Sequence, residues 1–170
     1  MAGSGWVMIM SGGNLASISG VVDVGIIVIG HFDNPAKVDA LKFLRRVLKQ
    51  EIRAIIPVTA FIGAYHIMVN YLGVPRKSAK DVLTETLNTR SPAFYQDVDI
   101  DDAIEALDVA SIYNIESWDG YLVALAHRFS CNIIYSIDRK LSRVEGITVI
   151  NPIPEDKMRE YHKFIEKLME

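Results

Sequence analysis

Two kinds of hydrophobic pattern alternate along the chain. Short apolar runs rich in β-branched residues are typical of buried strands, and they occupy 21–29, 53–58, 132–137 and 147–150. A further short strand is expected from Phe94 to Val98. Between these runs, apolar residues recur at helical spacing over 35–48, 59–72, 75–88, 99–113 and 118–129, and again from Pro154 onward. This alternation predicts an α/β fold with a central, mostly parallel sheet and helices on both faces.

Several residues at the ends of these segments are signals for helix starts and stops. Thr59 and Ser117 are expected to cap the helices that follow them. Gly73 and Pro75 end one helix, and Pro75 begins the next. The helix over 99–113 is predicted from the spacing of apolar residues, namely Ile104, Leu107, Ala110 and Ile112; Val38 begins the corresponding set over 35–48.

The chain is expected to form one domain. Its 170 residues, of which 50% are hydrophobic, suffice for a single substantial core. Residues 1–18 contain several glycines and serines and keep no hydrophobic period, so we predict a poorly ordered leader there and a domain over 19–170 that includes the C-terminal helix. The longest apolar stretch is too short to span a membrane, and no secretory signal is evident, which favours a cytoplasmic location.

Charge and cysteine content exclude several classes of site. The net charge of −3 and pI near 5.8 are not those of a protein that binds nucleic acid tightly over its whole surface, so any such binding must be local. Cys131, the single cysteine, can form neither an internal disulfide nor a cysteine-rich zinc site. The sequence also has no His-Glu-x-x-His motif, no glycine-rich phosphate loop and no Gly-x-Ser-x-Gly motif.

Three aspartates stand at positions that combine into a candidate site. Asp23 interrupts the first apolar run, where an ionised carboxylate needs a compensating partner. Asp119 lies in the first turn of a helix, and Asp138 directly follows the strand over 132–137. Each also has a local explanation: a strand-end turn helped by Gly25 for Asp23, the helix dipole for Asp119, and a cap of residues 139–142 for Asp138.

Taken together, the aspartates point to a cation. The carboxyl ends of parallel strands meet at one edge of a sheet, and the start of a helix can reach that edge. Carboxylates gathered there repel one another unless a cation neutralises them, and a site with oxygen ligands alone suits Mg²⁺ or Mn²⁺ better than zinc.

Three short motifs carry a resemblance to a known family. They are Val22-Asp23-Val24, the segment from Trp118 to Ala126 that begins Trp-Asp-Gly, and Ser136-Ile137-Asp138. In this order and spacing the chain resembles the PIN-domain ribonucleases, including the toxins of toxin–antitoxin pairs, over residues 21–150. The resemblance implies a PIN-like three-layer α/β/α fold and an endoribonuclease that cleaves single-stranded RNA.

The resemblance also implies a role for each site residue. Asp23, Asp119 and Asp138 would hold Mg²⁺ or Mn²⁺, which polarises the phosphodiester and lowers the pKa of the attacking water. Ser136 would support Asp138 or bound water. Two basic residues that follow, Arg139 and Lys140, could contact substrate phosphates, although solvated turn residues are an equal explanation. The implied partners are RNA and an antitoxin protein.

The chain departs from the family pattern at two positions. Members usually carry a glutamate early in the helix after the second strand, where this chain has Gly63. Gly25 stands where a hydroxyl or amide side chain is common. Water, His66 or Glu116 could replace the missing ligand, or the site could be catalytically weakened.

Three alternatives follow from other readings of the acidic residues. A PIN-like module that binds RNA or protein without catalysis would explain Gly63. A flavodoxin-type phosphoacceptor domain would use Asp23 with Mg²⁺, but the last strand lacks the lysine that such a domain needs after it. The run from Asp97 to Asp102 imitates the opening of an EF-hand loop, but acidic residues that lead into a helix explain it better.

Apolar helix faces raise the question of self-association. The C-terminal helix and the helix pair between Tyr65 and Leu87 both present apolar residues. These faces predict a homodimer, and burial within one chain explains them equally well.

Overall fold

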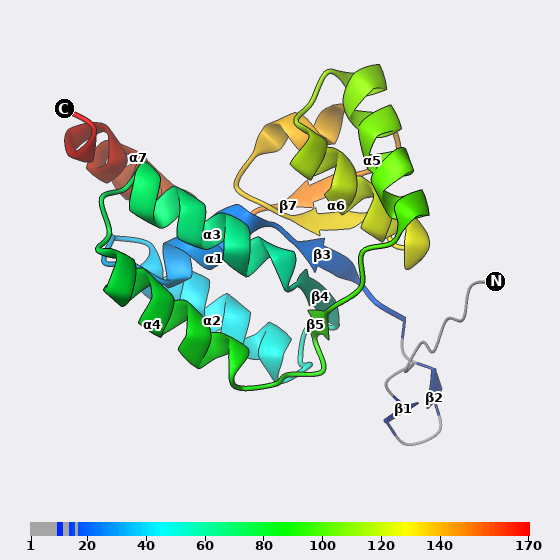
Figure 1. Cartoon of the computed structure of the whole chain (residues 1–170), viewed down its shortest axis with the longest axis horizontal. Coiled ribbons are helices and arrows are strands. Elements are labelled where there is room, and N and C mark those ends of the chain that lie inside the picture. The colour runs from blue at the N-terminus through cyan, green and yellow to red at the C-terminus, as the bar shows by residue number, and fades with distance from the viewer. Residues whose placement is uncertain (1–9, 12–13, 16) are drawn as a thin grey trace.

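The computed structural model, which describes residues 10–11, 14–15 and 17–170, is a three-layer α/β/α fold (Figure 1). Five strands form the central sheet in the order β5-β4-β3-β6-β7, and every neighbouring pair is parallel. The strands are β3 (Gly20–Val22), β4 (Ala54–Pro57), β5 (Phe94–Tyr95), β6 (Ile133–Tyr135) and β7 (Thr148–Ile150). The predicted fold class is therefore confirmed.

Helices cover both faces of this sheet and create two cores. Neighbouring strand residues alternate between the cores, so that Val22 and Ile56 belong to one and Val21 and Ile55 to the other. The first core is built from α1 (Val24–Gly30), α2 (Lys37–Leu48), α3 (Thr59–Asn70), α4 (Arg76–Leu87) and α7 (Glu155–Leu168). The second is built from α5 (Ile100–Tyr113), α6 (Ser117–Arg128) and the 3-10 helix η1 (Arg139–Arg143).

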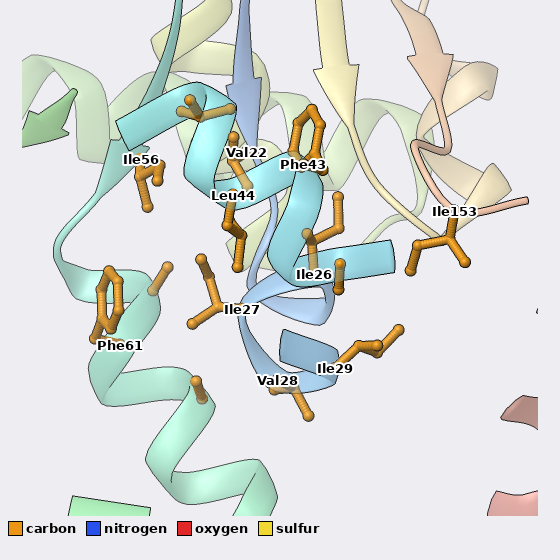
Figure 2. Close-up of a cluster of buried hydrophobic side chains, with 14 of the residues drawn as sticks. Val22, Ile26, Ile27, Val28, Ile29, Phe43, Leu44, Ile56, Phe61 and Ile153 are labelled. Atoms are coloured by element: carbon orange, nitrogen blue, oxygen red, sulfur yellow. The ribbon is translucent and has the colours of Figure 1, made fainter. Parts of the chain in front are cut away.

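The apolar run over 21–29 is not one strand, and this prediction was wrong. The strand ends at Val22, and α1 begins at Val24 with Asp23 as its N-cap. Residues 26–30 are all buried, and Figure 2 shows Ile26 to Ile29 among side chains of α2, α3 and Ile153. A helix that is apolar on every side has no helical period, so its sequence cannot be told from a buried strand.

Two predicted helix caps are wrong, and several apolar residues of the predicted helices face outward. Thr59 and Ser117 do not act as caps, because Val58 and Glu116 occupy the N-cap positions and neither makes a side-chain cap bond. Val38, the first of the apolar residues that predicted the helix over 35–48, is 62% exposed. In α5 the large aliphatic residues lie outside, with Ile104 at 53%, Leu107 at 62% and Ile112 at 74% exposure.

The inward face of α5 carries smaller residues because this helix packs very closely on α6. Asp102, Ala106 and Val109 are buried on that face. A Cβ atom at Gly120 of α6 would collide with the backbone carbonyl oxygen of Ala106, and it would lie 3.3 Å from the Cβ of Ala110. Only glycine permits this approach of the two backbones, so Gly120 allows the short distance between α5 and α6.

Three further predictions concern the leader, the domain boundary and membrane-spanning segments. In the predicted leader, β1 (Met10–Ser11) and β2 (Asn14–Leu15) pair as an antiparallel ladder, while residues 1–9, 12–13 and 16 lie outside the described residues. The leader and the domain boundary at residue 19 stay predictions. Among the described residues, no helix is long and apolar enough to cross a membrane.

Burial within one chain accounts for the apolar helix faces that raised the possibility of a homodimer. Met158 and Tyr161 of α7 and Met68 and Leu83 of α3 and α4 belong to the first core. The homodimer stays a prediction.

Candidate functional site

Asp23 lies at the carboxyl end of the central strand β3, where the chain turns into α1. Its Oδ1 accepts a hydrogen bond from the Val24 backbone N–H at 2.6 Å, and its Oδ2 accepts one from Ser136 Oγ at 2.6 Å. The residue is only 4% exposed. The turn explanation is therefore correct, because one oxygen caps the helix, and the other oxygen faces the neighbouring strand end.

Ser136 connects two of the predicted site residues. It is fully buried after β6, next to β3 in the sheet, and its Oγ also accepts a hydrogen bond from the Asp138 backbone N–H at 2.9 Å. The hydroxyl therefore donates to Asp23 and accepts from the backbone of Asp138. This arrangement fixes the Asp23 carboxylate relative to the end of β6.

Asp138 is half-buried and acts as the N-cap of η1. Its Oδ1 accepts a hydrogen bond from the Lys140 backbone N–H at 2.9 Å. The local explanation as a cap is thus correct. The cap leaves the residue at the carboxyl end of β6, beside the end of β3.

Asp119 is buried in the first turn of α6, and its charge is opposed by its neighbours. Burial is the main cause that raises its pKa from 3.8 to about 7, and the charges of Asp23, Asp138 and Glu116 raise it further. Lys140 acts in the opposite direction with the smallest effect of these. Near neutral pH a large fraction of Asp119 is therefore protonated.

Asp23 belongs to the same electrostatic group. Burial raises the pKa of its carboxyl, the hydrogen bonds from Ser136 and Val24 oppose this, and the charges of Asp138 and Glu116 add to it. The predicted carboxylates from β3, α6 and β6 thus interact, and Glu116, at the N-cap of α6, joins them.

The residues present fit a hard divalent cation by their chemistry. All the donors are carboxylate or hydroxyl oxygens, which suit Mg²⁺ and Mn²⁺. In the described part of the chain, no three His, Cys, Asp or Glu side chains form a cluster arranged to hold a metal ion. The site is therefore a group of mutually repelling acids, and their side chains would have to move together around a cation to bind it.

Gly63 marks an open position on the α3 side of this group. A Cβ atom there would lie 3.4 Å from Val24 Cγ2, an ordinary contact, so a side chain would fit beside the start of α1. His66 is engaged elsewhere, with its Nδ1 2.9 Å from Asn70 Nδ2 and its ring edge-on to Tyr71. Of the two residues that could replace the missing glutamate, Glu116 is therefore the better placed.

Gly25 has a packing reason. A Cβ atom at this position would lie 3.1 Å from Ile137 Cγ1, so a larger residue would press on the segment between Ser136 and Asp138.

A hollow of about 300 Å³ adjoins the acidic group and shares Ser136 with it. Its other lining residues come from η1, from the end of β6 and from the region of β7, namely Ile137, Arg139, Ser142, Val149 and Asn151. Arg139 and Lys140 are both exposed. Sequence reasoning missed Ser142 and Asn151, because neither belongs to a motif or carries a charge.

The acidic run at 97–102 is explained by helix formation, as expected. Asp99 is the N-cap of α5 and accepts a hydrogen bond from the Asp102 backbone N–H at 2.8 Å. Arg128 Nη1 lies 2.6 Å from an oxygen of Asp99 and 2.6 Å from one of Asp102. These carboxylates are thus neutralised within the chain.

Comparison with known proteins gives a likeness at the level of structure. No protein-family model matches the sequence, and no curated protein is significantly similar to it. A solved structure described as "Toxin-antitoxin complex from Klebsiella pneumoniae" contains a chain that superposes with a TM-score of 0.53 at 12% identity, over 79% of this chain and 98% of that one. The two chains share a fold. At this identity the likeness to the Klebsiella chain extends to the fold alone.

Proposed function

We propose that this protein is a metal-dependent endoribonuclease of the PIN type that cleaves single-stranded RNA. The observation that carries the proposal is the gathering of Asp23, Asp119 and Asp138 from three separate elements, where burial first and the charges of the neighbouring acids second raise the pKa of Asp119 to about 7. Such a group is most stable with a bound cation. The fold shared with a chain of a toxin–antitoxin complex supports the same proposal.

The residues of the chain would divide the work as follows. Asp23, Asp119 and Asp138 hold Mg²⁺ or Mn²⁺, which supplies Lewis acidity toward the phosphodiester and the attacking water. Ser136 keeps the Asp23 carboxylate oriented through its 2.6 Å hydrogen bond. Arg139 and Lys140, which directly follow Asp138, meet substrate phosphates and lend positive charge to an otherwise acidic surface.

The direct test measures Mn²⁺-dependent cleavage of single-stranded RNA by the purified protein. Asp23→Asn and Asp119→Asn should abolish cleavage while circular dichroism shows an unchanged fold. Asp108→Asn is a matched control, because Asp108 is exposed on α5, and it should cleave normally. Cleavage that survives in both site variants would exclude the proposed site.

We further propose that the protein is the toxin of a toxin–antitoxin pair. Expression of the wild-type chain alone in a bacterial host should then arrest growth, and Asp119→Asn should not. Growth arrest by both forms at equal protein levels would separate toxicity from the carboxylates.

A second candidate function rests on Gly63. A module that has lost one ligand could bind RNA without cutting it, and the absence of a ready three-ligand cluster in the described residues agrees with this. Titration with Mn²⁺ distinguishes the two functions. A saturable effect on the protein favours the nuclease, whereas RNA retention with no saturable Mn²⁺ effect favours the binding module.

A further inference from the structure

The hollow beside the acidic group is lined by both apolar and polar residues. Ser136, which donates a hydrogen bond to Asp23, forms part of its wall, so the hollow and the acids are directly adjacent. Ile137 and Val149 supply apolar surface, and Arg139, Ser142 and Asn151 supply polar groups. Its volume of about 300 Å³ is that of a small ligand site.

Hydrogen bonds within the chain fix what two of the polar groups can offer. Asn151 Oδ1 accepts from the Ile153 backbone N–H at 2.9 Å, which orients the amide and leaves its Nδ2 as a donor. Ser142 Oγ donates to the Arg139 carbonyl oxygen at 2.6 Å, which leaves its lone pairs as acceptors. One oriented donor and one oriented acceptor therefore belong to residues that line the hollow together with the apolar ones.

Arg139 adds a positive charge at this position. It is exposed, and in the described part of the chain its guanidinium forms no ion pair, in contrast to Arg128. A guanidinium in this state is available for a phosphate, which it can contact through two parallel hydrogen bonds.

We propose that this hollow binds one nucleotide of single-stranded RNA next to the cleaved phosphodiester. The base packs against Ile137 and Val149, its polar edge meets Asn151 Nδ2 and Ser142 Oγ, and its phosphate meets Arg139. Exposed bases of single strands are recognised by this combination of apolar contact and edge hydrogen bonds. A phosphate ion alone would not use the apolar wall. The inference rests on the proposed function, because it assigns part of the same substrate.

The test uses the full-length Asp119→Asn protein without metal, so that binding is measured apart from cleavage. Nucleoside 5′-monophosphates and inorganic phosphate are titrated while amide and side-chain NMR shifts are followed. We expect saturable binding of at least one mononucleotide, with shifts at Asn151 and Ser142. Arg139→Gln and Asn151→Leu should each weaken it roughly 3- to 10-fold. Arg143→Gln is the matched control, since Arg143 is exposed in the same 3-10 helix but does not line the hollow.

Several outcomes would overturn the inference. The inference fails if no mononucleotide binds saturably, or if Arg139→Gln and Asn151→Leu both leave the affinity unchanged. It also fails if inorganic phosphate binds as tightly as the mononucleotides. If RNA cleavage depends on the aspartates but no mononucleotide binds, the proposed function stands and this inference fails. If cleavage is absent but mononucleotides bind in an Asn151-dependent manner, the inference stands as a nucleotide site.

In an active enzyme, a further readout separates binding from chemistry. Asn151→Leu in the otherwise wild-type chain should raise KM for RNA several-fold and leave kcat nearly unchanged. An equal fall in kcat with unchanged KM would contradict a role in substrate binding.

Discussion

The two ends of α6 hold acidic groups that differ in how their charge is compensated. At the end of the helix, Arg128 lies 2.6 Å from carboxylate oxygens of both Asp99 and Asp102. At its start, Asp119 meets the charges of Asp23, Asp138 and Glu116, and Lys140 opposes them only weakly. A neutralised acidic group thus lies at one end of α6, and an uncompensated one lies at the other.

The difference separates structural carboxylates from candidate functional ones. Burial raises the pKa of Asp102, but Arg128 is the first influence that opposes it, and the pKa of Asp99 is lowered. The pair with Arg128 thus ties the start of α5 to the end of α6. At the other end, no cationic side chain among the described residues pairs with Asp119 in this way, so the group is suited to a cation from solution.

The largest expected effect comes from removal of the charge at Asp119. A carboxyl with a pKa of about 7 in the folded state and about 3.9 when unfolded binds more protons in the folded state between these values. The wild-type protein without metal should therefore lose stability as pH rises from about 4 to about 7. Asp119→Asn should be more stable than wild type at pH 8, by roughly 4 kcal/mol.

Urea denaturation at pH 8 and pH 4, with chelator present, measures this effect. The difference between the two proteins should nearly vanish at pH 4. A stability difference between the two proteins that does not grow between pH 4 and pH 8 would contradict an uncompensated Asp119.

The second effect is stabilisation by a bound divalent cation. Mn²⁺ at pH 8 should raise the free energy of unfolding of the wild-type protein, by about 2.7 kcal/mol when its concentration is 100 times its Kd. The gain should fall below pH 7, because a protonated Asp119 cannot ligate the ion. Thermal melts with and without chelator measure it, and Asp119→Asn should show little response. Equal responses of both proteins would point to a different metal site.

The third effect tests the neutralised end of α6. Arg128→Gln leaves the buried Asp102 without its cation and should lower the free energy of unfolding by roughly 2 kcal/mol. Adding Asp102→Asn should restore part of this loss, which a double-mutant cycle by urea denaturation would detect. Lys157→Gln is the control, because its ion pair with Glu160 lies on the surface. A purely additive double mutant would mean that the pair has no energetic coupling.

The smallest change in stability is expected when a carboxylate is added at Gly63. A side chain fits there, with its Cβ 3.4 Å from Val24 Cγ2, so the fold of Gly63→Glu should persist. One more carboxylate should tighten Mn²⁺ binding roughly 10-fold, because affinity follows the number of charged ligands. Mn²⁺ titration of this variant and of Gly63→Gln, which adds similar bulk without charge, separates charge from size. Equal affinities in both variants would show that position 63 does not reach the site.

The parallel α/β fold could be predicted from the alternation of strands and helices, and the expectation that acidic residues lie near one edge of the sheet had a physical reason. Asp23 and Asp138 follow buried strands, and parallel strands end at a common edge, so their meeting follows from topology. The helix α1 could not be predicted in the same way. Its residues are buried on all sides, which removes the periodic signal of a helix. The helix starts at the capping bond of Asp23, and the sequence does not distinguish a capping aspartate from other aspartates beside apolar runs.

The faces of α5 show a second limit of sequence reasoning. Ile104, Leu107 and Ile112 have the spacing of a helix, which was correct, yet they lie outside. Because the backbones of α5 and α6 lie so close, the inner face of α5 needs small residues. A pattern of hydrophobic residues does not show which face must carry small ones. The hollow with Ser142 and Asn151 was likewise invisible, because it is formed by segments whose polar residues have no common motif.

Asp119 and Gly120 are adjacent, but packing requires the glycine, whereas the proposed chemistry requires the aspartate. The glycine is required because Ala106 leaves no room for a Cβ atom, whether or not the protein has any activity. A descendant of this chain that had lost its acids would still need the glycine to keep its two helices in place. In a search for related proteins, Gly120 would thus report shared architecture, and the aspartate before it would report retained chemistry.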